Sequence, residues 1–306
     1  MKKTFETAID HLLSLDKRYV LLLADSDFEK YESVKSKYQH RCINFGIAEN
    51  NMVTAAAAIA KDGMIPIVYT VGAFLAYRAY ESIRDDVCLH NLNVKIVGMG
   101  QGVKINNFGP THHSTEDIAV LRVLPNLTII SPASPLEVVP AFEAAVLHEG
   151  PVYFRLGKAF EEEIYSEPPK FQIGKWNVLE SGTDITLIST GNIISNVLSA
   201  AKKLNESGVS AEVINASTLK PIDKECLINS ARKTGKVVTV EEHQIYGGLG
   251  GAVSEVLTAN GVNVMMDMIG FNDTFCTTYG WHRDLLEANG LSSMQIFERI
   301  RNFAQK

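Results

Sequence analysis

The chain of 306 residues contains few cysteines, and they lie far apart. They are Cys42, Cys88, Cys226 and Cys276. No two of them form a CxxC pair, which argues against a structural zinc site and against a disulfide-stabilised scaffold. Sparse, scattered thiols fit a reducing compartment, so we expect a cytoplasmic protein.

The sequence also lacks an excess of positive charge and any long hydrophobic run. Its 29 Lys and Arg residues are outnumbered by 35 Asp and Glu residues, which gives a net charge of −6. This balance lacks the basic footprint of a nucleic-acid-binding protein, so no nucleic-acid partner is expected. No apolar run approaches the roughly 18–20 residues that span a bilayer. Glu6 and Asp10 interrupt the first apolar stretch, which predicts an N-terminal helix of the mature protein rather than a signal peptide or membrane segment.

Short apolar runs alternate with amphipathic segments along most of the chain, a pattern typical of buried strands and covering helices. Strands are predicted at 19–24, 65–69, 94–98, 127–130, 152–156, 185–189, 211–214, 237–240 and 262–268. Helices are predicted at 5–13, 53–60, 74–89, 116–121, 135–148, 194–204, 250–259 and 292–303. Such alternation predicts an α/β fold with mostly parallel sheets flanked by helices.

An interruption in this pattern divides the chain. Residues 159–175 are acidic, contain Pro168-Pro169 and show little periodicity, as is typical of a linker. We therefore predict one α/β domain at 1–160, a linker at 161–180 and a second α/β domain at 181–306.

The first segment with chemical potential is the string INFGIAENNM at 43–52. It places Glu49 after a glycine turn and just before a helix of small residues. A glutamate at a helix start is favoured by the helix dipole alone. A carboxyl that points into a cavity beside close-packed small residues explains the pattern equally well.

A second segment, the loop GPTHHSTED at 109–117, follows a predicted strand and a glycine-rich turn. Loops of this kind bind ligands in parallel sheets. Thr115 could cap the next helix, but capping does not explain the adjacent His112 and His113. A metal site is disfavoured because neighbouring side chains rarely converge on one ion and no third ligand is evident, so no metal ligand is assigned.

Two further patterns have ordinary structural explanations. Phe74, Tyr77 and Tyr80 recur at helical spacing, which is more typical of a core stripe, although an aromatic ring beside a strand end could stack on a heterocycle. The string EEHQIYGGLGG at 241–251 invites a dinucleotide-binding interpretation. It fails the GxGxxG spacing and lacks the downstream acid, so a tight turn before a helix is favoured.

Taken together, these segments resemble the C-terminal part of transketolase. The strings INFGIAENNM, FLAYRAYESIR, GPTHHSTEDIAVLRVLPNLTIISPAS, GPVYFR and EEHQIYGGLGGAVSEVL occur in the family's order. They are most similar to the separate small subunit of split transketolases. The resemblance implies a pyrimidine-binding domain followed by a transketolase C-terminal domain, and two-carbon ketol transfer between sugars or sugar phosphates.

The resemblance also implies roles for individual residues. Glu49 matches the catalytic glutamate that hydrogen-bonds the pyrimidine of thiamine diphosphate, and Phe74 matches the aromatic that stacks on that ring. Tyr77 matches a neighbouring aromatic of the same pocket. His112 matches a catalytic histidine that faces the thiazolium and the substrate. The second domain is expected to make no cofactor contact of its own.

Several positions depart from the usual transketolase pattern. Gly100 stands where most members have a histidine, and Phe108 stands where they have an aspartate that contacts the sugar. Val71 replaces a further aromatic of the cofactor pocket. Lys158 replaces the phosphate-binding arginine, with Arg155 close by in sequence, so both are candidate substrate ligands. These changes predict a non-standard sugar, such as a deoxy, branched or sulfonated one.

The diphosphate-binding motif of the superfamily, GDG followed by Asn, is absent from the sequence. The resemblance therefore implies a partner subunit that carries this motif and binds the diphosphate together with Mg²⁺ or Ca²⁺. An α2β2 heterotetramer is expected. Alternatives are a subunit similar to 1-deoxyxylulose-5-phosphate synthase or to the β chain of 2-oxoacid dehydrogenase E1, and a non-catalytic paralogue.

Overall fold

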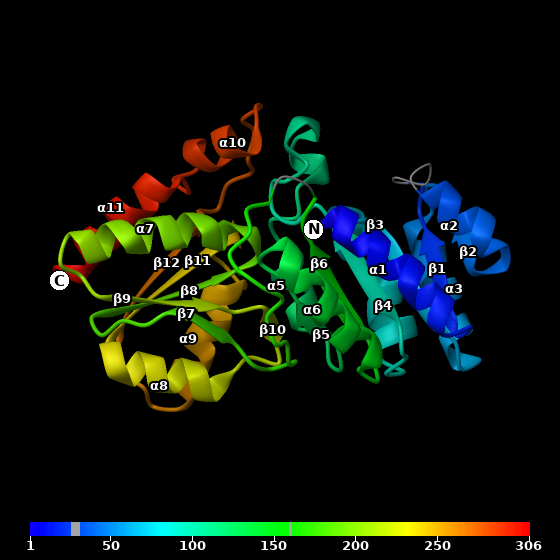
Figure 1. Ribbon diagram of the computed structural model, residues 1–306, viewed down its shortest axis with the longest axis horizontal. Coiled ribbons are helices and arrows are strands. Elements are labelled where there is room, and N and C mark those ends of the chain that lie inside the picture. Colours follow the sequence, from blue (N-terminus) through cyan, green and yellow to red (C-terminus); the bar gives the residue numbers. More distant parts are fainter. Residues whose placement is uncertain (26–30, 159–160) are drawn as a thin grey trace.

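The computed structural model, which describes residues 1–25, 31–158 and 161–306, contains two β-sheets (Figure 1). The first has seven strands in the order β10-β5-β6-β4-β3-β1-β2, and the second has five in the order β12-β11-β8-β9-β7. Pairing is parallel except for the two edge pairs β10–β5 and β7–β9. The predicted fold class is therefore confirmed.

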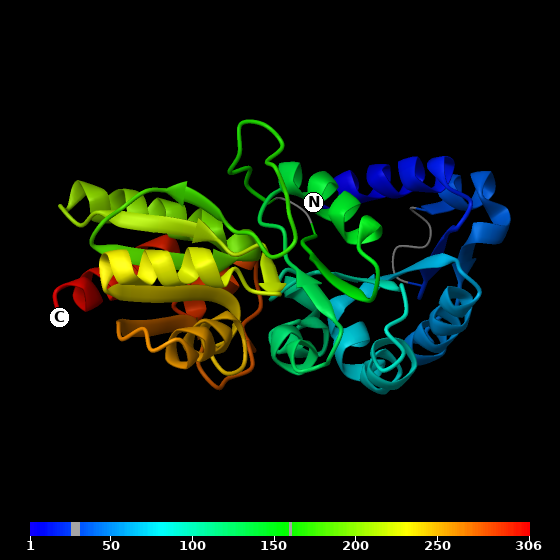
Figure 2. The ribbon, with the colours of Figure 1, turned by 90° about the horizontal axis from the view of Figure 1, so that it is seen from below.

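The first sheet consists mainly of fully buried apolar strands. Besides β10, its strands are β1 (Tyr19–Leu23), β2 (Cys42–Asn44), β3 (Ile65–Val71), β4 (Lys95–Met99), β5 (Thr128–Ile130) and β6 (Val152–Leu156), of which β2 is partly exposed. Helices α1 (Lys2–Leu15) and α6 (Pro135–Leu147) pack on one face. The other face is covered by α3 (Glu49–Lys61), the π-helical turns Phe74–Arg78 and Ile83–Cys88, α4 (Tyr80–Ser82) and α5 (Asp117–Arg122), as Figure 2 shows from below. A short helix, α2 (Glu32–Lys37), precedes β2.

The second sheet is also covered on both faces. Its strands are β7 (Asn177–Glu180), β8 (Ile185–Thr190), β9 (Ala211–Asn215), β11 (Lys236–Gln244) and β12 (Met265–Phe271). Helices α7 (Ile194–Glu206) and α11 (Ser293–Ala304) lie on one side, and α8 (Lys224–Thr234) and α9 (Leu249–Ala259) lie on the other (Figure 1). Helix α10 (His282–Ala288) follows the loop after β12.

Several elements differ from the prediction, which also omitted β2, α2, α8 and α10. The segment predicted as one helix at 74–89 is two π-helical turns around a short α-helical turn. Strand β7 lies inside the predicted linker, because this half-exposed edge strand has no apolar run to reveal it. Strand β10 (Thr218–Lys220) was not predicted, and it pairs with β5 of the first sheet. The domain bounds 1–160, 161–180 and 181–306 remain a prediction.

The two sheets also share hydrophobic contacts. One buried cluster includes Leu124 and Ile129 from the first sheet region and Ile188 and Ile214 from the second sheet. Within the described ranges, none of the helices has the length and apolar character that crossing a membrane requires.

Candidate active site

Glu49 is the first residue of α3, a helix that begins earlier than the sequence predicted. The preceding turn depends on Gly46, whose φ of +66° is readily adopted by glycine. The Glu49 side chain is 1% exposed, and its Oε2 accepts a hydrogen bond from Nη1 of Arg78 at 2.7 Å. A helix N-terminus and a guanidinium therefore both face this buried carboxyl.

Phe74 and Arg78 lie on one π-helical turn. The Arg78 guanidinium carbon is 4.9 Å from the centroid of the Phe74 ring, a cation–π contact. The His112 ring meets the same phenyl ring edge-on, with 5.0 Å between centroids. Glu49, Arg78, Phe74 and His112 therefore form one continuous set of contacts, drawn from three separate segments of the chain.

His112 ends the short 3-10 helix Pro110–His112. Its Nδ1 lies 3.0 Å from the Thr111 hydroxyl, and its ring is 4.9 Å from that of Phe108. Burial, and after it the positive charge of Lys158, lowers the pKa of His112 below its usual value. The imidazole is therefore mostly neutral near pH 7, when it can both accept and donate a hydrogen bond.

The influence of Lys158 on His112 gives a testable pH dependence. A nearby cation disfavours the protonated imidazole, so Lys158→Met is expected to raise the pKa of His112 towards its ordinary value of about 6.5. NMR titration of the chain, with the His112 signal assigned from its loss in His112→Gln, measures this pKa. Lys202→Met on the exposed side of α7 is the control. An unchanged His112 pKa in Lys158→Met would show that the two groups do not interact.

Tyr77 lies on the same π-helical turn, but its hydroxyl is engaged elsewhere. It donates to Oε2 of Glu116 at 2.7 Å and accepts from the Glu116 backbone N–H at 3.0 Å. Tyr77 thus connects this turn to the residue before α5. Its ring is partly exposed, and its predicted contact with a cofactor remains a prediction.

The structure corrects the prediction that Arg155 is a substrate ligand. This residue lies within β6 and is 1% exposed, and its Nε donates to Oδ2 of Asp117 at 2.8 Å. Its other nitrogens donate to Gln101 Oε1, Ser114 O and Glu242 O. With all three nitrogens satisfied inside the chain, Arg155 joins the two domains instead of contacting a substrate. Lys158, just beyond the strand, remains the candidate ligand for an anionic group.

Sequence reasoning did not single out Arg78, which contacts both Glu49 and Phe74. Its position four residues after Phe74 was the available signal, because residues at this spacing share a helix face. The second histidine of the pair, His113, is buried, with 2% of its surface exposed. Over the described ranges, no three His, Cys, Asp or Glu side chains are arranged to hold a metal ion.

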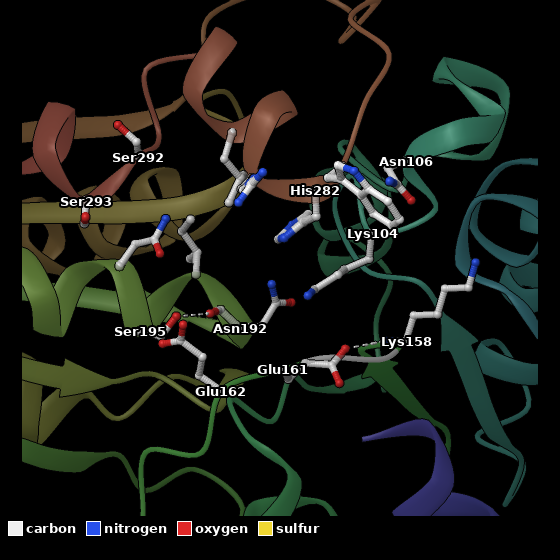
Figure 3. Close-up of a pocket in the computed structure, with 15 residues that line it drawn as sticks. Lys104, Asn106, Lys158, Glu161, Glu162, Asn192, Ser195, His282, Ser292 and Ser293 are labelled. Atoms are coloured by element: carbon white, nitrogen blue, oxygen red, sulfur yellow. Dashed lines mark hydrogen bonds between the residues drawn. The ribbon is translucent and has the colours of Figure 1, made fainter.

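A cavity of about 770 Å³ lies between the two domains (Figure 3). Lys104 and Lys158 line it from the first domain, and Asn192, Ser195 and His282 line it from the second. Figure 3 shows the side chains of Lys104, Asn192 and His282 approaching one another at its centre. Of the residues discussed above, Lys158 lines this cavity, whereas Glu49, Phe74 and His112 do not.

Comparisons with known proteins find relatives for both domains. The family model for the transketolase pyrimidine binding domain matches residues 1–160, and that for the transketolase C-terminal domain matches residues 174–296. A 6-deoxy-6-sulfo-D-fructose transketolase subunit from Clostridium sp. is 37% identical, over 98% of this chain and 94% of the relative. One subunit of an apulose-4-phosphate transketolase from Actinobacillus succinogenes is 33% identical, over 86% of this chain and 84% of the relative. A solved split gene transketolase, an inactive beta4 tetramer, superposes with a TM-score of 0.89 at 36% identity, covering 98% of this chain and 97% of that one.

Proposed function

The chain belongs to the transketolase family, whose enzymes depend on thiamine diphosphate, and we propose that it is the pyrimidine-binding subunit of a split transketolase. In this role it would transfer a two-carbon ketol unit between sugars together with a partner subunit. The observation that carries the proposal is the contact between segments that are distant in sequence. The helix start at Glu49, the turn with Phe74 and the loop with His112 meet at one place.

The residues at this place suit the pyrimidine half of the cofactor. Glu49 supplies a buried carboxyl, and Phe74 supplies a partly buried ring whose face is covered by the Arg78 guanidinium. Arg78 now contacts both groups, so it would have to move when a heterocycle binds between them. Its side chain is 51% exposed, which leaves it room to swing outwards.

The chemistry of each residue follows from its position. Bound thiamine diphosphate would supply the nucleophilic carbon and the electron sink. Glu49, whose side chain is 1% exposed, would hydrogen-bond the pyrimidine ring nitrogen. His112, neutral and beside Phe74, would bind substrate oxygens or move protons as their charge changes. Lys158 would attract an anionic group of the sugar.

The other half of the site would come from the partner subunit. Because GDG followed by Asn is absent from this sequence, the partner is proposed to carry that motif and to hold the diphosphate with Mg²⁺ or Ca²⁺. Two copies of each chain would complete two sites in an α2β2 assembly, since most assemblies close with two-fold symmetry.

Two positions support a non-standard sugar as substrate. A Cβ at Gly100 would collide with Ile105, so the isoleucine takes the space of a longer polar side chain. Phe108 is 62% exposed and its ring packs beside His112, where it offers a sugar no hydrogen bond. The relatives described above are transketolases of a sulfonated sugar and of apulose 4-phosphate. A modified sugar, deoxy, branched or sulfonated, is therefore the proposed substrate class.

A donor screen with the reconstituted complex tests this assignment. We expect kcat/KM for a modified ketose such as 6-deoxy-6-sulfofructose to exceed that for fructose 6-phosphate by at least about tenfold, because a missing polar partner typically costs about that much or more. Phe108→Asp should shift the preference back towards the ordinary sugar. Equal kcat/KM values for both donors, unchanged in Phe108→Asp, would contradict the proposed substrate class.

A further inference from the structure

The loop that carries His112 is held at its base by its own backbone. This segment, residues 100–116 between β4 and α5, is called the His112 loop. The Ser114 N–H donates to the Gly102 carbonyl at 2.8 Å, so the two ends of the loop are joined. Residues between them, including His112, depend on other contacts for their position.

Those other contacts come in large part from the C-terminal domain. The Val103 N–H donates to Oε1 of Glu242 at 2.7 Å, and Nδ2 of Asn106 donates to the Gly280 carbonyl at 2.6 Å. On the far side of His112, the Gln244 N–H donates to the Thr115 carbonyl at 2.8 Å. The Val103 side chain is itself buried in the hydrophobic cluster of the C-terminal domain. Both halves of the His112 loop are thus fixed to the second sheet.

Glu242 is the centre of this attachment. Its side chain is 2% exposed, and its oxygens face three groups: the Val103 N–H, Nδ2 of Asn192 at 3.1 Å and Nε2 of His282 at 3.0 Å. Burial alone raises the pKa of this carboxyl, but His282 and the hydrogen bonds outweigh burial and lower it overall. The ionised form therefore persists inside the protein and binds its donors strongly.

The backbone of the His112 loop lies very close to this carboxylate at Gly102. Gly102 adopts a φ of +60°, and a Cβ at this position would collide with the Glu242 carboxylate. Only glycine allows the backbone to approach so closely. The Arg155 guanidinium adds to the junction, since it donates to Ser114 O in the loop and to Glu242 O in β11.

We propose that Glu242 is a positioning residue for ketol transfer, which fixes the His112 loop so that His112 stands beside Phe74 at the active site. The C-terminal domain, expected to make no cofactor contact, thereby contributes to the reaction through the loop alone. This inference rests on the role proposed for His112.

A second buried carboxylate between the domains offers a matched control. Glu137 is fully buried and accepts hydrogen bonds from the Ala133 N–H and from Nδ2 of Asn215. Both of these partners lie outside the His112 loop. A purely structural role at the domain interface would make Glu137→Gln and Glu242→Gln equivalent.

The test uses the complex reconstituted with its partner subunit. We expect Glu242→Gln to lower kcat/KM by about tenfold or more, with little change in the cofactor dissociation constant, because Glu49 and Phe74 lie on other elements. Glu137→Gln should change melting temperature without this loss of kcat/KM. If Glu242→Gln does not fold, Gly102→Ala displaces the same contact from the loop side and should give the same result.

A double-mutant cycle with His112→Gln decides the mechanism. If Glu242 acts through His112, then Glu242→Gln should have almost no further effect in the His112→Gln background. Equal losses in both backgrounds, or an equal loss in Glu137→Gln, would overturn the inference. A His112→Gln variant with normal activity would instead contradict the proposed function, so the two failures can be told apart.

Discussion

Glu49→Gln is expected to reduce turnover of the assembled enzyme by about 10²–10⁴-fold, the range for loss of one acid–base group, while the melting temperature changes little. Glutamine has the shape of glutamate but cannot supply an acidic proton to a pyrimidine ring nitrogen. The cost to folding is expected to be small, because glutamine fills the same space and its amide oxygen can still accept a hydrogen bond from Arg78. The Arg78 partner is half exposed, so its loss also costs little.

Turnover and thermal melting measured on the same preparations check this expectation. Glu81→Gln is the matched control, because Glu81 is an exposed carboxylate in the first turn of α4, on the same side of the sheet. Near-normal turnover of a folded Glu49→Gln enzyme would remove Glu49 from the chemistry and leave it as a helix-dipole residue.

The chain without its partner is expected to show no transferase activity and to bind thiamine diphosphate weakly. It offers Glu49 and Phe74 to the pyrimidine, but its sequence has no GDG motif for the diphosphate. Half of the contacts cannot offset the loss of translational and rotational freedom that any ligand suffers on binding. Calorimetric titration with cofactor and Mg²⁺, before and after addition of the partner, measures the difference.

Adding the partner should raise affinity and activity together. Light scattering should then show an α2β2 particle, and the calorimetric titration should show two cofactors bound per particle. Phe74→Ala in the complex serves as a control, since it should weaken cofactor binding without preventing assembly. Tight one-to-one binding by the isolated chain would show that the diphosphate site lies within this sequence after all.

The sequence predicted the sheets well because their central strands are short, fully apolar and separated by amphipathic helices. It failed at β2, β7, β10, α2 and α10, which are too short to show a period. It also failed at α8, whose eleven residues bury only Leu227, Ser230 and Ala231 and therefore show little apolar periodicity. The π-helical turn at Phe74–Arg78 was hidden for a different reason. One extra residue in a helical turn changes which side chains share a face, and Arg78 meets Glu49 only through the tertiary fold.

Arg155 shows why part of the site could not be predicted. Its closeness to Lys158 in sequence suggested a shared task, yet one residue lies within β6 and the other lies past its end. The partner that neutralises Arg155 is Asp117, 38 positions away. Glu242 and the His112 loop are separated by a still longer stretch of chain, so no local pattern could reveal their contact.

Strand β10 has a consequence for how the protein is made. This edge strand of the first sheet follows β9 in the chain, so it comes well after the other strands of that sheet. Ribosomes deliver the N-terminal part first, and folding usually proceeds domain by domain. During synthesis the edge of β5 therefore stays open, with unpaired backbone groups that attract other strands, until residues 218–220 emerge. The nascent N-terminal domain is thus exposed to mispairing, and only the arrival of the following domain ends that exposure.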